Sequence, residues 1–398
     1  MRALPNWLES YLVYTENQES PEELHLWTGL ALLSAALRRK VWIDRGTYEL
    51  FPNLYIITVA ESAKIRKSAA VNIGIKLLKD AIPDLPTLSD SATPEGIVKH
   101  VNRTIMSEGE VRHKESHIFI HADELATLFS YDKQRASRLS ILLTQMFNCP
   151  SKYETTLKSE AQMIIHNCYP TLLAATDPFN LKVLPEDAIG GFLGRCIFVT
   201  GKKRRRNIAW PEFSGDNLHD KLLVDLARIG SLSGEVTVPG NTREHFSKWY
   251  DIISEVEITD RRLAAFHQRM HDTALKLATL LCVASSNSLI LDLKYLQAAI
   301  AIVEAQKKEF AQIQDWSTGT NYAQNRTKFI DLMRRNGGIA TKKLVLRQLA
   351  ISIQDFNALK MALEEEGTIR EVLIDPSRPS EIFYKFTADE ILRQQGGA

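Results

Sequence analysis

A lysine and a serine follow the first strongly apolar run of the chain. The run LYIITVA spans residues 54–60, and the loop AESAKIRKS then brings Lys67 and Ser68 to the start of a helical segment. Between a strand and a helix, such a lysine lies beside the β- and γ-phosphates of a nucleotide, and the hydroxyl binds Mg²⁺. In the usual spacing of a phosphate-binding loop, glycines would stand where this chain has Glu61 and Arg66. A purely structural strand-to-helix turn is therefore an equal alternative.

The remainder of the loop indicates which residues would contact the nucleotide. Small side chains such as Ser62 and Ala63 let the backbone approach a phosphate closely. The residues expected to bind the nucleotide are Ser62, Ala63, Lys64, Arg66, Lys67 and Ser68.

Two adjacent carboxylates end another apolar run, HIFIHA, at residues 117–122. Asp123 suits the water shell of Mg²⁺, and Glu124 suits the task of orienting and deprotonating the attacking water. Asp123 and Ser68 are thus the expected metal ligands. An aspartate that caps a helix, with a glutamate in its first turn, is the alternative. The Lys-Ser pair one strand-helix-strand unit earlier favours the catalytic interpretation.

A polar pair, Thr176 and Asp177, ends the run TLLAAT at residues 171–176. At the end of a core strand, Asp177 is a candidate sensor of the γ-phosphate or the attacking water. An aspartate before a proline, here Pro178, is equally typical of a turn.

Arg195 opens the last apolar run, RCIFVT, after a Gly-Gly turn. A fixed cation at a subunit edge is what an arginine finger acting on a neighbouring subunit requires. A surface arginine at the start of a strand is the alternative.

A predicted hairpin and a basic run are candidates for contacts with nucleic acid. The segment SKYETTLKSEAQMII, residues 151–165, is typical of a β-hairpin, and its lysines Lys152 and Lys158 are candidates to contact a DNA backbone. The run KKRRR at residues 202–206 would add electrostatic affinity if it faced the DNA. A solvated hairpin and a solvated loop are the alternatives.

Short β-branched runs separated by helical stretches must position these residues. The runs cover residues 54–60, 86–90, 117–122, 171–176 and 195–200. Their near-continuous apolar character is typical of a parallel sheet covered on both faces. The sequence therefore predicts an α/β core.

Four segments are predicted along the chain. Residues 1–50 form a helical collar, residues 51–214 the α/β core, residues 215–316 a helical lid and residues 322–398 a winged-helix domain after a polar linker at 315–325. The third helix of the last segment is acidic, which argues against insertion into a major groove. Contacts with DNA would then come from the preceding helices, through Arg334, Arg335, Lys342, Lys343 and Arg347; docking on a protein is the alternative.

Composition excludes several classes of protein. The chain has 398 residues, a net charge of +1 and 44% hydrophobic residues, as expected for a folded protein of two or three domains. Its longest uncharged apolar runs are too short to span a membrane, and the beginning of the chain lacks a signal core, so a cytoplasmic location is expected. The 4 cysteines form no CxxC pair, which excludes a zinc ribbon and disfavours a disulfide framework.

Taken together, the motifs resemble those of phage- and plasmid-encoded P-loop ATPases, replicative or primase-associated helicases that are similar to the AAA+ helicases. The resemblance covers roughly residues 7–310. It is carried by FPNLYIITVAESAKIRKSAA, SATPEGIVKHV, IFIHADELATLF, YPTLLAATDP and GGFLGRCIFV.

This resemblance implies an AAA+-like fold and an ATP-driven DNA helicase. ATP would bind at Lys67 and Ser68, Asp123 and Glu124 would handle Mg²⁺ and water, and Asp177 would act as the sensor. Arg195 would be the finger. Arg269 is expected on the same face of a lid helix as Lys276, and it would be a second sensor. A solvated helix face is the alternative for Arg269.

The implied assembly is a ring, expected to be a hexamer, on single-stranded or forked DNA, with a primase or other replication proteins as partners. Two features depart from the pattern. The loop lacks glycine, and Asp177 stands where the similar minichromosome-maintenance helicases have asparagine. The competing function is a non-hydrolysing, nucleic-acid-binding initiator or assembly protein that retains the ATPase fold.

Overall fold

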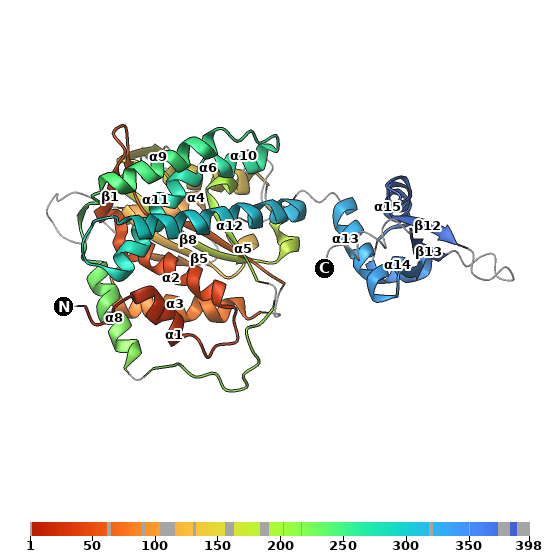
Figure 1. The fold of residues 1–398 in the computed structure, drawn as a ribbon, viewed down its shortest axis with the longest axis horizontal. Coiled ribbons are helices and arrows are strands. Elements are labelled where there is room, and N and C mark those ends of the chain that lie inside the picture. Colours follow the sequence, from red (N-terminus) through yellow and green to blue (C-terminus); the bar gives the residue numbers. More distant parts are fainter. Residues whose placement is uncertain are drawn as a thin grey trace. The chain divides into compact units, whose positions relative to one another are not determined.

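The computed structural model forms two compact units, Met1–Gln314 and Asp315–Ala398 (Figure 1). It describes residues 2–61, 65–89, 93–103, 116–129, 133–155, 163–183, 191–201, 203–215, 217–317, 321–349, 351–372 and 383–387. Of the residues proposed above, Ser62, Ala63, Lys64, Lys158 and Lys202 of the run KKRRR lie outside these ranges. The finer division into four segments remains a prediction.

A five-stranded parallel sheet forms the centre of the larger unit, in the order β4-β5-β8-β3-β9. The strands are β3 (Tyr55–Val59), β4 (Thr87–Ser89), β5 (Ser116–Ala122), β8 (Cys168–Thr176) and β9 (Cys196–Thr200). The five apolar runs are thereby confirmed as strands of one sheet. Every residue of β3 and β8 is buried, as expected for a sheet covered on both faces. Because β8 lies between β3 and β5, its carboxyl end separates the loop after β3 from the carboxylates after β5.

Helices cover both faces of this sheet (Figure 1). On one side lie α1 (Trp7–Tyr14), α2 (Glu22–Leu37), α3 (Lys67–Ala81) and α8 (Leu218–Ile229), and on the other α4 (Pro94–Arg103), α5 (Leu125–Phe129) and α6 (Lys133–Met146). The buried helix α2 packs on β8, where the hydroxyls of Ser34 and Thr171 are 3.0 Å apart. It also packs closely on α3, since a Cβ at Gly74 would come within 2.4 Å of Thr28. The N-terminal helices are therefore an integral layer of the larger unit.

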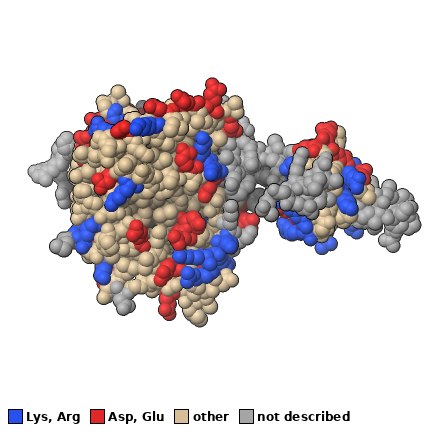
Figure 2. All heavy atoms as spheres, in the orientation of Figure 1, with Lys and Arg blue, Asp and Glu red and all other residues tan. Residues whose placement is uncertain are grey.

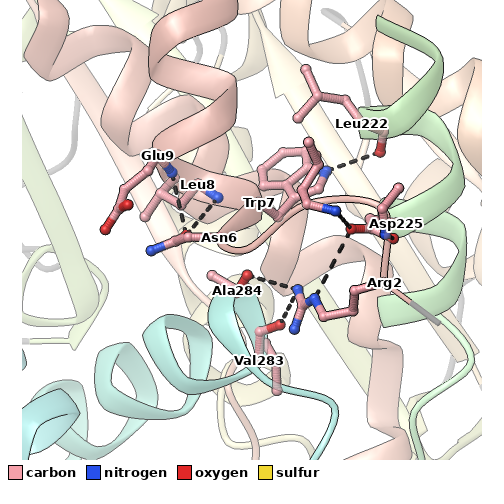
Figure 3. A network of polar contacts seen from close by, with 11 residues as sticks. Arg2, Asn6, Trp7, Leu8, Glu9, Leu222, Asp225, Val283 and Ala284 are labelled. Carbon is pink, nitrogen blue, oxygen red and sulfur yellow. Dashed lines mark hydrogen bonds and ion pairs between the residues drawn. The ribbon is translucent and has the colours of Figure 1, made fainter. Parts of the chain in front are cut away.

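Hydrogen bonds anchor the first residues of the chain to two later helices (Figure 3). The buried Asp225 of α8 accepts hydrogen bonds from the backbone N–H groups of Ala3 and Leu4, at 2.9 and 2.8 Å. Arg2 donates to two carbonyls in the last turn of α11 (Met270–Ser285), at 2.9 and 2.7 Å, where a cation also meets the negative end of the helix dipole. The Trp7 indole donates to a carbonyl of α8 at 2.9 Å. These contacts fix the start of α1.

The predicted lid contains α9 (Gly240–Ser254), α10 (Arg261–His267), α11 and α12 (Leu293–Ser317). Placing Arg269 within a continuous helix was wrong, because the helical segment breaks between α10 and α11 and Arg269 is the N-cap residue of α11. Next to this break the buried ring of His267 bonds the carbonyl of Ile253 in α9 at 2.8 Å, and its Nδ1 lies 3.2 Å from the sulfur of Met270. The predicted linker at 315–325 was also too long, since α12 continues to Ser317 and α13 begins at Asn321.

Two small sheets complete the larger unit. One joins β10 (Gly234–Glu235), β1 (Val41–Asp44) and β2 (Glu49–Leu50). The other is the antiparallel pair β6 (Lys152–Thr155) and β7 (Met163–His166), which confirms the hairpin expected at 151–165. Short 3₁₀ turns lie at Arg38–Lys40, Pro178–Val183 and Leu193–Arg195.

The smaller unit has α13 (Asn321–Arg335), β11 (Ile339–Thr341), α14 (Lys342–Leu349), α15 (Ile353–Glu365), β12 (Ile369–Val372) and β13 (Phe383–Phe386). The expected three helices and final strand pair are confirmed, and the three-residue β11 was not predicted. The strands form an antiparallel sheet in the order β11-β13-β12. The core between sheet and helices includes Phe329, Met333, Val345, Phe356, Leu363 and Tyr384.

All of the cysteines are buried and unpaired with one another, as expected for reduced core residues. Among the described residues, none of the helices has the length and apolarity that a bilayer crossing requires.

Candidate nucleotide site

The ammonium group of Lys67 lies at the carboxyl edge of the five-stranded sheet. It donates hydrogen bonds to the carbonyl of Ala60, just after β3, at 2.5 Å, and to the carbonyl of Thr176, the last residue of β8, at 2.8 Å. The backbone N–H of Ala60 also donates to the Thr176 carbonyl, at 3.1 Å. Lys67 is only 8% exposed. The strand ends thus hold this lysine at one position in the first turn of α3.

Two carboxylates act on the charge of Lys67. Burial lowers its pKa, and the negative charges of Glu124 and Asp177 act in the opposite direction. Lys67, Glu124 and Asp177 follow the adjacent strands β3, β5 and β8, and the structure brings them to one edge of the sheet. That these residues bind a nucleotide remains a prediction.

Thr176 connects the lysine to the glutamate. Its hydroxyl donates to Oε1 of Glu124 at 2.9 Å, while its carbonyl accepts from Lys67. The side chain of Thr176 is fully buried, so its hydroxyl is shielded from solvent. Sequence reasoning placed a polar sensor at this strand end but selected Asp177, which is partly exposed. The residue that contacts Glu124 through its side chain is Thr176.

The backbone of Arg66 takes the left-handed conformation, with φ 56° and ψ 44°, at the N-cap of α3. Left-handed backbone is strained for a residue with a Cβ and comfortable for glycine. Position 66 is where a glycine would stand in the usual loop. The chain therefore keeps the backbone turn that the glycine serves while using an arginine.

The exposed residues at this edge fit Mg²⁺ and a phosphate chain. Ser68 lies exposed in the first turn of α3, a helix of 15 residues whose N–H groups and dipole favour an anion. Asp123 is exposed directly after β5. A hydroxyl and a carboxylate are oxygen ligands of the kind that Mg²⁺ prefers, with water and phosphate oxygens as the remaining ligands. The predicted metal ligands therefore suit the ion chemically.

Three other cations gather at the opposite, amino-terminal edge of the sheet. Arg195 ends the 3₁₀ turn before β9 and donates to the carbonyl of Gly191 at 2.7 Å. Burial, and then the like charge of Arg269, lower the pKa of Arg195 to about 10, which leaves it charged at neutral pH. Behind them the buried Lys276 donates to Oδ1 of Asn53 at 2.7 Å. Arg269 and Lys276 each interact electrostatically with Arg195. That they share a helix face and act together remains a prediction.

The register of β3 and β9 separates Arg195 from Lys67. Cys196, next to Arg195, pairs with Tyr55 at the start of β3, whereas Thr200 pairs with Val59 at its end. At about 3.3 Å per residue, the two edges are roughly 15 Å apart. Arg195 and Lys67 of one chain therefore do not share a phosphate.

The residues proposed for DNA contact differ in their surroundings. Lys152, on the hairpin, forms an exposed ion pair with Glu154 on the same strand. In the run KKRRR, Arg204 pairs with Glu19 at 3.3 Å and Arg205 with Glu22 at 2.8 Å. These two arginines are thus engaged with the N-terminal segment of their own chain.

Comparison with known proteins gives little further guidance. No protein family and no curated protein matches the chain. Among solved structures it is similar to a full-length MCM homolog from Methanopyrus kandleri, at 12% sequence identity and a TM-score of 0.41. The match covers 76% of this chain and 59% of that chain, so this chain matches less than two thirds of its length. The function proposed below rests on the geometry of the site.

Proposed function

We propose that the chain is an ATP-driven, ring-forming DNA helicase or translocase motor of a mobile-element replication system. The observation that carries this proposal is the connection of Lys67 through Thr176 to Glu124 at the carboxyl edge of the sheet. A cation, a carboxylate and a buried hydroxyl there provide what phosphoryl transfer to water needs: charge stabilisation and a positioned base.

Each residue has a distinct task in this proposal. Lys67 stabilises the charge that develops on the transferred phosphoryl group, and Glu124 orients the attacking water and accepts its proton. Ser68 and Asp123 hold Mg²⁺, which neutralises charge on the β- and γ-phosphates. Thr176 holds the Glu124 carboxylate in place through its hydroxyl. Asp177 remains the proposed sensor of the phosphate or the water.

Arg195 supports the assembly into a ring, expected to be a hexamer. It lies at the sheet edge opposite to its own Lys67, next to Arg269, and Asp272 is the only carboxylate that acts appreciably on Arg269 among the described residues. A neighbouring subunit can bring its own phosphate chain to these arginines. Arg195 is then the finger that acts on the neighbour's nucleotide, and Arg269 a second contact.

The smaller unit offers one charged face for DNA. From residue 332 to residue 354 the chain has 5 basic residues and no acidic one, and Lys343 and Arg347 are exposed one turn apart on α14. On the acidic helix α15, Lys360 pairs with Glu371 and Glu364. Figure 2 shows the same segregation, with red atoms on the side of α15 and blue atoms on the side of α14. In a winged-helix unit of this kind, α14 and the end of α13 would contact phosphates.

A non-hydrolysing nucleic-acid-binding protein is the second candidate. It is favoured by the absence of glycine from the loop, since position 66 takes the left-handed conformation with a residue that carries a Cβ. ATP hydrolysis separates the two functions.

Steady-state ATP hydrolysis with Mg²⁺, with and without single-stranded DNA, tests the proposal. Wild-type protein should turn over ATP, and Glu124→Gln should lose about 10²-fold or more in turnover while keeping nucleotide affinity. Glu255→Gln, an exposed residue at the end of α9, is the matched control and should behave as wild type. No turnover above background at saturating ATP would refute the motor and leave the second candidate.

A further inference from the structure

The strained backbone at Arg66 is held by a segment 47 positions earlier in the chain. Nε of Arg66 donates to Oε2 of Glu19 at 3.0 Å. The hydroxyl of the neighbouring Ser20 donates to the backbone carbonyl of Arg66 at 2.9 Å. The bond with Glu19 holds the side chain of Arg66, and the bond with Ser20 holds its backbone carbonyl. Both partners lie outside the loop that contains Arg66.

Glu19 is itself fixed. Its carboxylate also accepts from Arg204 and from the backbone N–H of Ile208, each at 3.3 Å, and its side chain is only 15% exposed. The hydrogen bond from Arg66 is the main reason that the pKa of Glu19 lies below its usual value. Ser20 is 1% exposed. Both residues are therefore rigid partners and not surface side chains that happen to reach the loop.

The segment that carries Glu19 and Ser20 is anchored at both ends. Before it, α1 is fixed by the contacts of Arg2 and Trp7 with later helices (Figure 3). After it, α2 packs against α3 at Gly74. Gln18 additionally donates to the carbonyl of Glu212 at 3.0 Å. The two partners of Arg66, Glu19 and Ser20, therefore belong to a segment that is fixed on both sides.

The backbone of Arg66 determines where Lys67 and Ser68 point. Arg66 is the N-cap, and its carbonyl accepts the first backbone hydrogen bond of α3, from Ala69, at 3.1 Å. On its other side Ile65 is buried and packs against Gly201, where an added Cβ would lie 2.1 Å from the Ile65 side chain. Arg66 thus takes the left-handed conformation between two buried residues, Ile65 and Lys67.

We propose that Glu19 and Ser20 are positioning residues of the phosphate loop, which hold Arg66 in the conformation that glycine adopts elsewhere without help. This inference rests on the proposed function, since it assigns the loop a nucleotide. It explains how a loop without glycine presents Lys67 and Ser68, and it makes the N-terminal layer part of the site. An arginine at this position can form an ion pair with Glu19 of the N-terminal layer, which a glycine cannot do.

A double-mutant cycle between Glu19→Gln and Arg66→Gly tests the inference. Glu19→Gln keeps the shape and removes the charge, and the affinity for a fluorescent ATP analogue with Mg²⁺ should fall about tenfold, the loss expected for one charge-assisted hydrogen bond. In the Arg66→Gly background the same change should alter affinity less than about twofold, because glycine adopts the left-handed conformation unaided. Ser20→Ala should show the same dependence on the background.

Glu22→Gln is the matched control, since Glu22 pairs with Arg205 at the same surface and has no ion pair with the described residues of the loop. It should leave nucleotide affinity unchanged in both backgrounds. An equal loss from Glu19→Gln with arginine and with glycine at position 66 would overturn the inference, because Glu19 would then act independently of Arg66.

Hydrogen exchange without nucleotide separates failure of this inference from failure of the proposed function. Glu19→Gln should speed amide exchange in the first turn of α3, and should not do so in the Arg66→Gly background. If wild-type protein binds no nucleotide, the proposed function fails, and the exchange data still decide whether Glu19 holds Arg66. Unchanged exchange in Glu19→Gln would overturn the positioning role.

Discussion

Two buried lysines lie at opposite edges of the same five-stranded sheet. Lys67, 8% exposed, donates to the strand-end carbonyls of Ala60 and Thr176 and lies near two carboxylates. Lys276, 4% exposed, donates to the backbone and side-chain oxygens of Asn53. Its ammonium also lies 3.8 Å from the centre of the Phe147 ring. Both are cations in a core, and burial lowers the pKa of each.

The difference lies in what surrounds each charge. At the carboxyl edge, Lys67 is followed by an exposed hydroxyl and has Glu124 and Asp177 nearby, so an incoming phosphate and Mg²⁺ complete a balanced set of charges. At the amino edge, the charge of Arg195 interacts with those of Arg269 and Lys276, and the carboxylate of Asp272 acts on Arg269 and Lys276. In the proposed function, one edge binds the nucleotide of its own chain, and the positive charge at the other edge meets the nucleotide of a neighbouring chain.

The largest effect should come from Arg195 at the amino edge. Arg195→Ala should keep ATP binding and lose about 10³-fold in turnover, because a finger acts on transition-state charge. Mixing Arg195→Ala with Lys67→Ala chains should restore part of the ATPase rate, since one interface of a mixed ring pairs an intact finger with an intact loop. No recovery at any mixing ratio, with mixed oligomers confirmed, would place the action of Arg195 within its own subunit.

At the carboxyl edge, Thr176→Val tests the connection to Glu124. Valine matches threonine in shape but cannot hold the Glu124 carboxylate, so turnover should fall about tenfold or more with little change in nucleotide affinity. Thr171→Val, at a buried threonine in the middle of the same strand, is the matched control for stability. An equal loss of activity in both variants would mean that Thr176 supports only the fold.

The pH dependence of the free energy of unfolding tests the burial of Lys276 at the amino edge. The pKa of Lys276 falls to about 8 in the folded protein, below its ordinary value of 10.5, chiefly because it is desolvated. The unfolded chain then binds more protons between these two pH values, so this residue makes the folded state gain stability as pH rises. Relative to Lys276→Met, the wild-type free energy of unfolding should rise by about 3 kcal/mol from pH 8 to pH 10.5. Denaturant unfolding at several pH values measures the difference, and parallel curves for the two proteins would contradict the account.

The elements of the core could be predicted from the sequence because each strand carries its own local signal. A run such as LYIITVA is buried on both faces, and its pattern shows this without knowledge of its neighbours. Lys67 and Glu124 were selected for a related reason, since Glu124 stands just after such a run and Lys67 begins the helix that follows one.

What the sequence did not indicate depends on residues far apart in the chain. Glu19 and Arg66 meet only because α2 packs on α3, and no spacing in either segment signals that contact. Thr176 was passed over for Asp177 because a buried hydroxyl becomes informative only once its partner Glu124 is known. The break before Arg269 lies beside the contact of His267 with Ile253 in another helix, and an amphipathic pattern continues through it.

Calorimetric titration of ATP with Mg²⁺ into wild type, Lys67→Ala and Lys276→Met tests the central claim most directly, that the carboxyl edge is the nucleotide site. Wild type and a folded Lys276→Met should each bind one nucleotide per chain with similar affinity. Lys67→Ala should lose about 10²-fold in affinity, because it lacks the ammonium that the strand ends hold in place. Equal binding by Lys67→Ala and wild type, or loss of binding only in a folded Lys276→Met, would contradict this account.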